Sequence, residues 1–409
     1  MTVDTLARQR HSRSALAGYD PTRVETASVL VVGAGALGQN LLLDLALAGI
    51  GTLIVVDHDA FEDHNRTRSP CYPTASEQAR LGMGKASVAA HKIVPLMTAR
   101  RPLARYAATR VQDVGDAAVA QADVVCSAVD NAAARHYLAE RCRAHGKTLV
   151  EAGFEGSRLN LGVFGPDPGQ PCYRCIVPSP AGAFSCDRYA RAAAQARIAP
   201  AIQSAAAALA ALQAEQAIET LHGRAALVGK RMFGDIRTLA FRVRTLRVNP
   251  TCAGAHAPID RRVDLDLGPP ATVAQLAEAA RSLLGPSRLR LPAQFIGRIP
   301  CASCARLTDA MAPEWRWEAD PRCQPCGGPF PTSHADAVPF AHPVLDIAEP
   351  QAWAEIAEKT LAELGLGACA AIEAERLGDG RHIVLRLPGA SVTAFVNVPE
   401  PNQIKEVAE

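Results

Sequence analysis

The chain has 409 residues and a nearly balanced charge, with 43 Lys and Arg against 41 Asp and Glu and no long basic stretch, which argues against a nucleic-acid partner. Its length exceeds what one hydrophobic core usually serves, so we expect two or three domains. The amino terminus lacks the pattern of a signal peptide, and the most apolar stretch, 205–211, is too short to span a bilayer, which predicts a cytoplasmic protein without a membrane partner.

Apolar runs and helical stretches alternate along the first part of the chain. The apolar runs are short enough for strands and lie at 28–32, 52–56, 123–127 and 148–151. The stretches with helical spacing of apolar residues lie at 37–48, 84–93 and 132–144. Strand and helix in turn predict an α/β fold with a doubly wound, Rossmann-like and mostly parallel sheet.

The pattern changes after Gly156. Apolar and polar residues alternate at 158–164 and 238–248, on either side of a long predicted helix at 202–221. Such alternation is typical of antiparallel strands, so we expect an antiparallel extension on the same domain.

A glycine-rich turn follows the first predicted strand. Gly33, Gly35 and Gly38 form a Gly-x-Gly-x-x-Gly pattern that opens the first helix, and small residues there let the backbone approach a phosphate at a helix N-terminus. Asp57 ends the second strand, where a carboxylate can accept hydrogen bonds from ribose hydroxyls. The pattern predicts a nucleotide site, and its alternative is tight packing of helix on strand without a ligand.

Polar side chains beyond Asp57 distinguish this site from that of an oxidoreductase. Asn65, Arg68 and Lys85 follow it closely, and Asp130 follows the strand 123–127. Arg and Lys can neutralise charge on a triphosphate whose α-phosphorus is attacked, whereas a dinucleotide needs no such cluster. A carboxylate at the end of a strand can hold magnesium. The joint spacing indicates ATP and Mg²⁺, although each residue alone fits a solvated surface charge.

The order of these motifs resembles the family of ubiquitin-activating enzymes and their bacterial relatives, which adenylate the sulfur carriers of molybdopterin and thiamin synthesis. The resemblance covers residues 8–256. It rests on seven pieces in family order, namely Arg10-His-Ser-Arg13, VLVVGAGALG, VVDHD, Asn65-x-x-Arg68, Gly84-Lys85-Ala86, Ala128-Val-Asp130-Asn131 and Cys172-Tyr-Arg-Cys175. It implies that a glycine carboxylate attacks the α-phosphate of ATP, releases pyrophosphate and becomes an acyl-adenylate, with positioning and charge neutralisation carrying the rate.

The resemblance also assigns roles to single residues. It gives the ribose to Asp57 and the magnesium ion to Asp130. The residues that it implies for phosphate binding are Asn65, Arg68 and Lys85. The remaining nucleotide-binding positions are those of the glycine turn and the residue after Asp130, namely Gly33, Gly35, Gly38 and Asn131.

Arg13 lies upstream of the first strand. In the resembling enzymes the matching arginine enters the neighbouring protomer's site as an arginine finger, so the resemblance implies a homodimer. By the sequence itself, Arg10 and Arg13 fit a charged N-terminal arm equally well.

Cys172 and Cys175 form a Cys-x-x-Cys pair that needs two more ligands for a closed zinc site. The resembling family supplies a second pair after the last strands of the domain. Here Cys252 matches the first cysteine of that pair, while Ala255 occupies the place of the second. We expect His256, the next residue, to be the fourth zinc ligand, and the alternative is a degenerate loop without a metal.

Four further cysteines have the spacing of a zinc ribbon, in which two turns present four thiolates to one ion. They are Cys301, Cys304, Cys323 and Cys326. A full set of four thiolates leaves no open coordination position, so a structural zinc is expected. A redox dithiol is the weaker alternative, because neither pair lies in a thioredoxin-like βαβ pattern.

A Pro- and Asp-rich segment, 258–270, predicts a domain boundary. A helix is predicted beyond it at 272–284, and a further helix with two strands at 349–364, 368–375 and 382–387. The expected domains are an adenylation domain at 1–258, a linker helix with the zinc ribbon at 259–335, and a small α+β module at 336–409.

Cys186 lies in a predicted loop before the long helix and outside every Cys-x-x-Cys pair. In the resembling family this loop often bears the cysteine that forms a thioester or acyl-disulfide with the carrier. A positive charge at Arg188 can favour the thiolate. An inert cysteine is the alternative.

Three activities remain open. The favoured one is adenylation of a ubiquitin-like protein, thioester transfer to Cys186 and hand-off to a conjugating enzyme recruited by the C-terminal module. The second is activation of a sulfur carrier for cofactor biosynthesis, and the third is adenylation of a peptide in natural-product synthesis. Outside this class, a nucleotide-binding scaffold or an NAD-dependent oxidoreductase leaves Arg68, Lys85 and Asp130 unexplained.

Overall fold

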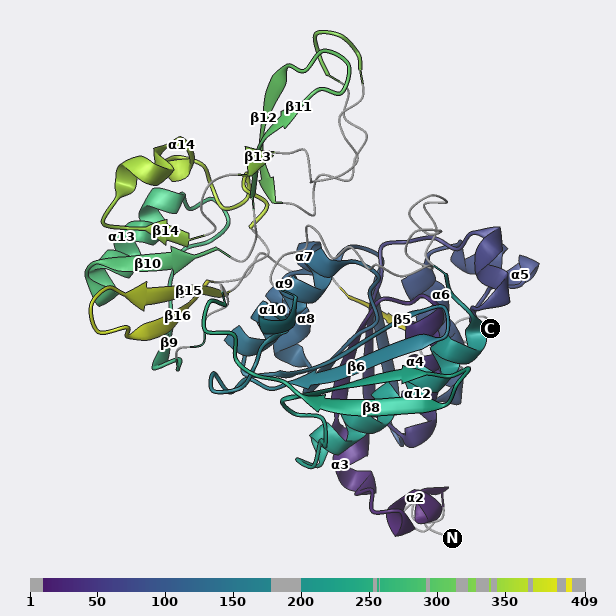
Figure 1. Cartoon of the computed structure of the whole chain (residues 1–409). Helices are drawn as coiled ribbons and strands as arrows, with labels where there is room; N and C mark the ends of the chain where they lie inside the picture. The colour runs from purple at the N-terminus through teal and green to yellow at the C-terminus, as the bar shows by residue number, and fades with distance from the viewer. Residues whose placement is uncertain are drawn as a thin grey trace, which may run out of the picture.

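The computed structural model describes residues 10–177, 200–252, 256, 258–291, 295–313, 323–328, 338–339, 344–366, 371–387 and 395–398. These residues form three sheets, of nine, five and three strands (Figure 1). Within this part of the chain, no helix has the length and apolar character that a membrane crossing requires.

The nine-stranded sheet has the order β17-β3-β2-β1-β4-β5-β6-β7-β8. Its parallel part consists of β1 (Ser28–Val32), β2 (Thr52–Val56), β3 (Leu103–Ala107), β4 (Val124–Ser127) and β5 (Thr148–Glu155). Antiparallel strands extend it on one side, namely β6 (Arg158–Phe164), β7 (Lys230–Asp235) and β8 (Ala240–Thr245). The predicted mostly parallel sheet with an antiparallel extension is confirmed.

Two hydrophobic cores cover the two faces of this sheet. In β1, Leu30 and Val32 belong to one core, while Val29 and Val31 belong to the other. Because both faces are buried, the strand is apolar after Ser28 and shows no alternation. The helices on the face of Val29 are α4 (Ala36–Ala48), α6 (Lys85–Ile93) and α12 (Gln203–Leu221). Those on the face of Leu30 are α7 (Val111–Val114), α8 (Asp116–Gln121), α9 (Ala132–Ala144) and α10 (Tyr173–Ile176).

Short helices complete this part of the chain. They are α2 (Ser12–Leu16), α3 (Pro21–Thr26), η1 (Asp63–Thr67), α5 (Ala75–Leu81) and η2 (Val94–Leu96). Capping residues determine where two of these helices begin. Thr74 and Glu77 form a reciprocal capping box at the beginning of α5, and the Asp20 carboxylate accepts the first N–H groups of α3.

The five-stranded sheet has the order β14-β10-β15-β16-β9. Its strands are β9 (Arg261–Asp264), β10 (Ser287–Arg290), β14 (Val344–Asp346), β15 (Ala371–Arg376) and β16 (His382–Arg386). Helix α13 (Val273–Leu284) packs on it after a capping box at Thr272. The sheet takes strands from both sides of the expected boundary at residue 335, so both sides contribute to one α+β unit.

The third sheet is an insertion between β10 and β14. It contains β11 (Phe295–Pro300), β12 (Leu307–Pro313) and β13 (Val338–Pro339). In Figure 1 the β11–β12 hairpin projects from the two larger sheets. The chain then returns to the first domain, because β17 (Val396–Val398) pairs with β3 at the edge of the nine-stranded sheet.

The prediction of a helix at 349–364 is wrong. The structure has only η5 (Pro350–Trp353) and α14 (Ala354–Ala357), followed by turns. The reason lies in tertiary contacts. The Glu363 carboxylate accepts the backbone N–H of Thr360 at 2.7 Å, and Thr360 forms a β-bridge with Thr272. The backbone of Thr360 therefore makes these hydrogen bonds in place of helical ones.

Candidate nucleotide site and metal sites

The three glycines of the turn between β1 and α4 have different surroundings. Gly33 has a φ of 95°, and a Cβ there would lie 2.6 Å from the carbonyl oxygen of Ala128. A Cβ on Gly38 would lie 1.8 Å from the carbonyl oxygen of Gly33. At Gly35, by contrast, no atom of the described residues lies within 4 Å of that position. The N-terminus of α4 therefore faces open space that can accept a phosphate.

Asp57 lies directly beyond β2 and contacts this turn. Its carboxylate accepts the backbone N–H of Ala34 at 2.6 Å and that of Asp59 at 2.7 Å. Burial raises the pKa of Asp57. The strand register explains the contact, because Val56 pairs with Val32 and the residues after them are neighbours. The ribose role of Asp57 stays a prediction, and its contact with the glycine turn places it beside the expected phosphates.

The three predicted phosphate ligands have different surroundings. Lys85 starts α6, and its Nζ lies 2.8 Å from Asp59 Oδ2. Arg68 is half-buried and donates to the carbonyl oxygen of His64 at 2.9 Å. Asn65 is buried, and its Oδ1 accepts the backbone N–H of Glu62 at 2.9 Å. In this structure Asn65 therefore shapes the loop, while Lys85 and Arg68 carry the available positive charge.

Asp59 was missed by the sequence interpretation. It accepts both the backbone N–H and the side chain of Lys85, at 2.9 and 2.8 Å. The second aspartate of the VVDHD motif was the available signal. The pair lies at the surface on the Asp59 side, where 48% of the side chain is exposed, and the Lys85 side chain is 13% exposed.

Asp130 and Asn131 follow β4 at the same edge of the sheet. Asn131 caps α9, because its Oδ1 accepts the backbone N–H of Ala134 at 2.8 Å. Its Nδ2 lies 3.4 Å from Asp130 Oδ1. The Asp130 side chain is exposed and so has the access that a magnesium ligand needs. The carboxyl ends of β1, β2 and β4 thus bring together the glycine turn, Asp57 and Asp130.

Arg13 lies at the opposite edge of the sheet. Its helix, α2, is anchored by Arg10, which donates to the carbonyl oxygen of Thr98 at 2.7 Å, and by the buried His11, which contacts Gly49. Gly49 and Thr98 precede β2 and β3, so this anchor lies at the amino ends of the parallel strands. In Figure 1, α2 stands apart from the sheet. The structure does not bring exposed Arg13 to the glycine turn of its own chain.

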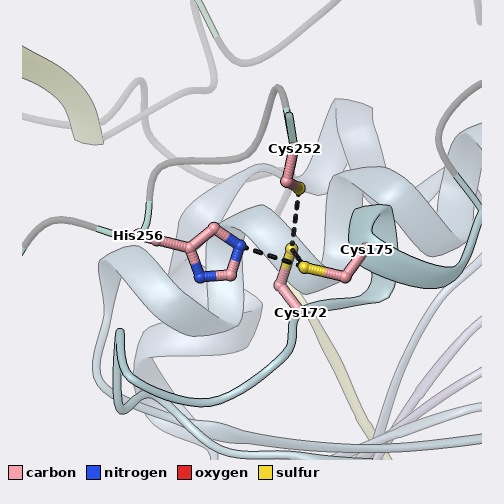
Figure 2. Close-up of side chains that lie close together, drawn as sticks. All are labelled: Cys172, Cys175, Cys252 and His256. Atoms are coloured by element: carbon pink, nitrogen blue, oxygen red, sulfur yellow. Dashed lines mark hydrogen bonds between the residues drawn. The ribbon is translucent and has the colours of Figure 1, made fainter. Parts of the chain in front are cut away.

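Four side chains of the first predicted zinc site converge (Figure 2). The sulfur of Cys172 lies 3.9 Å from that of Cys175 and 3.7 Å from that of Cys252. His256 Nε2 lies 3.2 Å from the Cys175 sulfur, while His256 Nδ1 lies 3.0 Å from the carbonyl oxygen of Pro168. A zinc–sulfur bond of about 2.3 Å implies tetrahedral edges of about 3.8 Å, so this set fits a zinc ion.

The chemistry of these thiols also favours a cation. Burial and the neighbouring sulfurs of Cys252 and Cys175 raise the pKa of Cys172 to about 12. A cation between the sulfurs would favour the thiolate form of Cys172. The contact from Pro168 fixes the imidazole so that Nε2 faces the thiols.

The second cysteine cluster joins two turns of the inserted sheet. The sulfurs of Cys301 and Cys326 lie 3.5 Å apart, and those of Cys304 and Cys323 lie 3.8 Å apart. Each turn ends with a residue of positive φ, 58° at Ala305 and 66° at Gly327. Hydrogen bonds from the backbone of Cys304 and Ser303 lower the pKa of Cys301 to about 6, which favours a thiolate. The four sulfurs fit one tetrahedral zinc ion.

Cys186 and the nearby Arg188 lie outside the described residues. Among the other single cysteines, Cys71, Cys126 and Cys142 are buried. Burial raises the pKa of Cys126 to about 12, so this thiol is not activated.

The fold and the site define a Rossmann-like α/β protein with an open glycine turn and two thiol-rich clusters. The chain belongs to the ThiF family, whose model matches residues 8–254. The resemblance drawn from the motifs is therefore confirmed. The match ends before the five-stranded sheet, so the α+β unit and its inserted ribbon lie outside the family region.

Curated relatives match about two fifths of the chain. The chain is 37% identical over 161 residues to "Adenylyltransferase and sulfurtransferase MOCS3" of Mus musculus, covering 39% of this chain and 33% of the relative. It is 33% identical over 161 residues to the Arabidopsis thaliana protein of the same name, with the same coverage. A third relative is "Adenylyltransferase and sulfurtransferase uba4" of Aspergillus niger, 33% identical over 168 residues, covering 39% of this chain and 33% of the relative. The chain thus spans about a third of the length of these relatives.

Solved structures share the fold. A crystal structure of E. coli MccB with MccA-N7isoASN matches with a TM-score of 0.50 at 19% identity, covering 61% of this chain and 75% of that one. A second MccB structure, with SeMet MccA, also has a TM-score of 0.50 at 19% identity, covering 61% of this chain and 74% of that one. This likeness confirms the architecture of the first domain.

Proposed function

We propose that this chain is an ATP-dependent adenylyltransferase that activates the C-terminal glycine carboxylate of a ubiquitin-like or sulfur-carrier protein. One observation carries the proposal: the glycine turn, Asp57 and Asp130 meet at the carboxyl edge of the sheet, in a chain of the ThiF family. The names of the curated relatives, each an adenylyltransferase, support it.

The reaction divides among the residues of this edge. The carrier carboxylate is ionised at neutral pH, so it attacks the α-phosphorus without a side-chain base, and pyrophosphate leaves. Arg68 and Lys85 neutralise the charge that develops on the phosphate oxygens. Asp130 would hold the magnesium ion, which would supply positive charge at the phosphates. The open space at Gly35 admits the phosphates to the helix N-terminus.

We further propose a homodimer in which Arg13 acts in the partner's site. The anchor of α2 at the amino ends of the strands leaves Arg13 remote from its own glycine turn. A finger from this position therefore serves a second protomer. The two thiol-rich clusters each hold a structural zinc in this proposal.

The step after adenylation has two candidates. In one, Cys186 takes the acyl group as a thioester and passes it to a conjugating enzyme. In the other, a sulfur carrier receives sulfur at its adenylate, and the sulfurtransferase names of the curated relatives favour this route. A Cys186→Ala variant decides the first route, which requires that a hydroxylamine-sensitive carrier thioester disappear while adenylation continues.

The test of the proposal is carrier-dependent exchange of pyrophosphate into ATP. We expect exchange with a carrier ending in Gly-Gly, and Asp130→Ala lowers its rate by about 10²–10³-fold because a transition-state charge contact is lost. Glu278→Ala, an exposed change on α13, is the matched control and keeps the rate. Absence of exchange with both ubiquitin-like and sulfur-carrier proteins would leave adenylation of a peptide or a nucleotide-binding scaffold as the better account.

A further inference from the structure

Helix α9 holds the backbone on both sides of Asp130. Asn131, the next residue, caps the helix through the N–H of Ala134. Arg135, in the first turn of the helix, donates from Nη2 to the carbonyl oxygen of Val129 at 2.7 Å. The residue before Asp130 and the residue after it are therefore both tied to α9.

Buried charges hold the guanidinium of Arg135 in place. Its Nε lies 3.3 Å from Glu151 Oε1, and Glu151 in β5 is fully buried. The other Glu151 oxygen accepts from Arg231 of β7 at 2.9 Å. Arg231 also donates to Asn160 Oδ1 at 2.5 Å. Arg135 is thus the last member of a chain of charges that runs from β7 through β5 to α9.

The surrounding backbone is shaped for this arrangement. A Cβ on Gly153 would lie 2.8 Å from Arg135 Nη2, so a larger residue there displaces the guanidinium. On the other face of the sheet, Gln213 of α12 donates to the carbonyl oxygens of Ser127 and Val150, both at 3.0 Å. Contacts from both faces therefore fix the carboxyl end of β4, and the Arg135 contact is the one nearest to Asp130.

We propose that Arg135 is a positioning residue that places the Asp130 carboxylate for magnesium-bound ATP, and that Glu151 and Arg231 keep Arg135 in that position. The inference rests on the proposed function, in which Asp130 holds magnesium. Arg135 acts through the carbonyl group of Val129 and needs no contact with the nucleotide.

The chemistry of arginine explains why this residue type is needed. A planar guanidinium bonds a carbonyl oxygen and a carboxylate at the same time, whereas a lysine ammonium is a point charge on a flexible stem. Arg135→Lys keeps a positive charge beside buried Glu151, which avoids an unpaired buried carboxylate. It removes the planar guanidinium that lies against Glu151 and donates to Val129, so it tests position separately from charge.

The same helix offers a matched control. Arg143, near the other end of α9, is also buried and lies 2.5 Å from the buried carboxylate of Glu373. Arg143→Lys weakens a comparable pair on the same helix, away from Asp130. Loss of stability alone therefore affects both lysine variants, and only a positioning role separates them.

The experiment titrates Mn²⁺ into the full-length protein with ATP and follows bound Mn²⁺ by electron paramagnetic resonance. Melting temperature is measured in parallel. We expect Arg135→Lys to raise the Mn²⁺ dissociation constant about tenfold, as loss of an outer-shell partner commonly does. Metal-free ATP binding and the Mn²⁺ affinity of Arg143→Lys stay within about twofold of wild type. Glu151→Gln also raises the Mn²⁺ dissociation constant. This second variant tests the proposal if Arg135→Lys does not fold.

A Mn²⁺ dissociation constant unchanged in Arg135→Lys and in Glu151→Gln overturns the proposal and leaves Arg135 a purely structural residue. The proposal also fails if wild type with ATP binds no Mn²⁺. If wild type binds Mn²⁺ with ATP but catalyses no carrier-dependent exchange, the proposed function fails, while the Mn²⁺ titration still decides the role of Arg135.

Discussion

At the residue scale, neighbouring glycines in one motif have separable roles. A methyl group on Gly38 would overlap the carbonyl oxygen of Gly33 at 1.8 Å, whereas one on Gly35 would meet no described atom within 4 Å. Gly35 also has a φ of −76°, which any residue adopts. The motif therefore combines a glycine required for folding with a glycine that leaves room for a ligand.

This difference predicts opposite results for two alanine variants. Gly35→Ala keeps its melting temperature within a few degrees of wild type, because nothing clashes, but the added methyl group weakens ATP binding by about tenfold or more. Gly38→Ala lowers the melting temperature instead. Calorimetric melting and titration with ATP measure both effects. Unchanged ATP affinity in Gly35→Ala would show that the phosphates lie elsewhere.

His256 provides a second prediction at this scale. It faces three thiols and receives support from the carbonyl oxygen of Pro168. We expect His256→Ala to lower the zinc content from about two ions per chain to about one, because three thiolates alone leave the shell incomplete. His256→Cys is the control and keeps the second ion. Metal analysis of dialysed protein reads the result, and two ions in His256→Ala would exclude His256 as a ligand.

Sequence reasoning at this scale locates a residue that follows a strand directly, while the role it assigns to that residue stays a prediction. Asp57 and Asp130 were predicted because strand ends determine their edge of the sheet. Arg135, Glu151 and Arg231 were missed, since they come from three elements distant in sequence and form no motif. Their association depends on the strand register, which spacing along the chain does not specify.

At the scale of elements, α9 joins the first domain to the α+β unit. Arg143 of α9 pairs with Glu373 of β15, and Arg141 donates to the carbonyl oxygen of Ala371. His382 of β16 lies 3.2 Å from the same Glu373 carboxylate. All of these side chains are buried, so the unit is fixed to the helix that begins beside Asp130.

This pairing predicts an acid-dependent stability. Burial alone would raise the pKa of Glu373, but His382 and the charge of Arg143 lower it to about 2. A carboxyl group with a lowered folded-state pKa stabilises the fold above its unfolded pKa and loses that contribution as pH falls toward 2. We expect the free energy of unfolding to fall over this acid range, and less steeply in Glu373→Gln. Urea unfolding at a series of pH values measures it, and equal slopes would contradict the pairing.

Element prediction followed the strength of the apolar pattern. Strands β1 and β2 were located to the residue, because both faces are buried and every position is apolar or small. Strand β7 was missed because Lys230–Asp235 contains only two large apolar residues, and β17 because three residues carry no periodicity. Their pairing with distant strands supplies the stability that local sequence lacks.

At the scale of the whole molecule, one hydrophobic core runs through both parts. It contains Leu138 of α9 together with Leu276 of α13 and Ile372 of β15. The return of β17 to β3 adds a second connection. The α+β unit therefore packs against the first domain through a continuous core.

The proposed dimer predicts complementation between two inactive variants. Arg13→Ala lacks the finger and Asp130→Ala lacks the magnesium ligand, so each alone has little exchange activity. A mixed dimer regains one complete site, and equal co-expression restores about a quarter of wild-type activity, because half of the dimers are mixed. Pyrophosphate exchange of the co-purified protein measures this. Absence of recovery would mean that Arg13 acts within its own chain, and full activity of Arg13→Ala alone would mean that it takes no part.

The central claim is that a carrier carboxylate attacks the α-phosphorus of ATP at the carboxyl edge of the nine-stranded sheet. Its most direct test uses a carrier labelled with ¹⁸O in its C-terminal carboxylate, incubated with enzyme, ATP and a thiol acceptor. Attack at the α-phosphorus moves one labelled oxygen into AMP, and mass spectrometry of the AMP detects it. We predict labelled AMP with unlabelled pyrophosphate. Label in inorganic phosphate with formation of ADP, or AMP without label, would contradict the account.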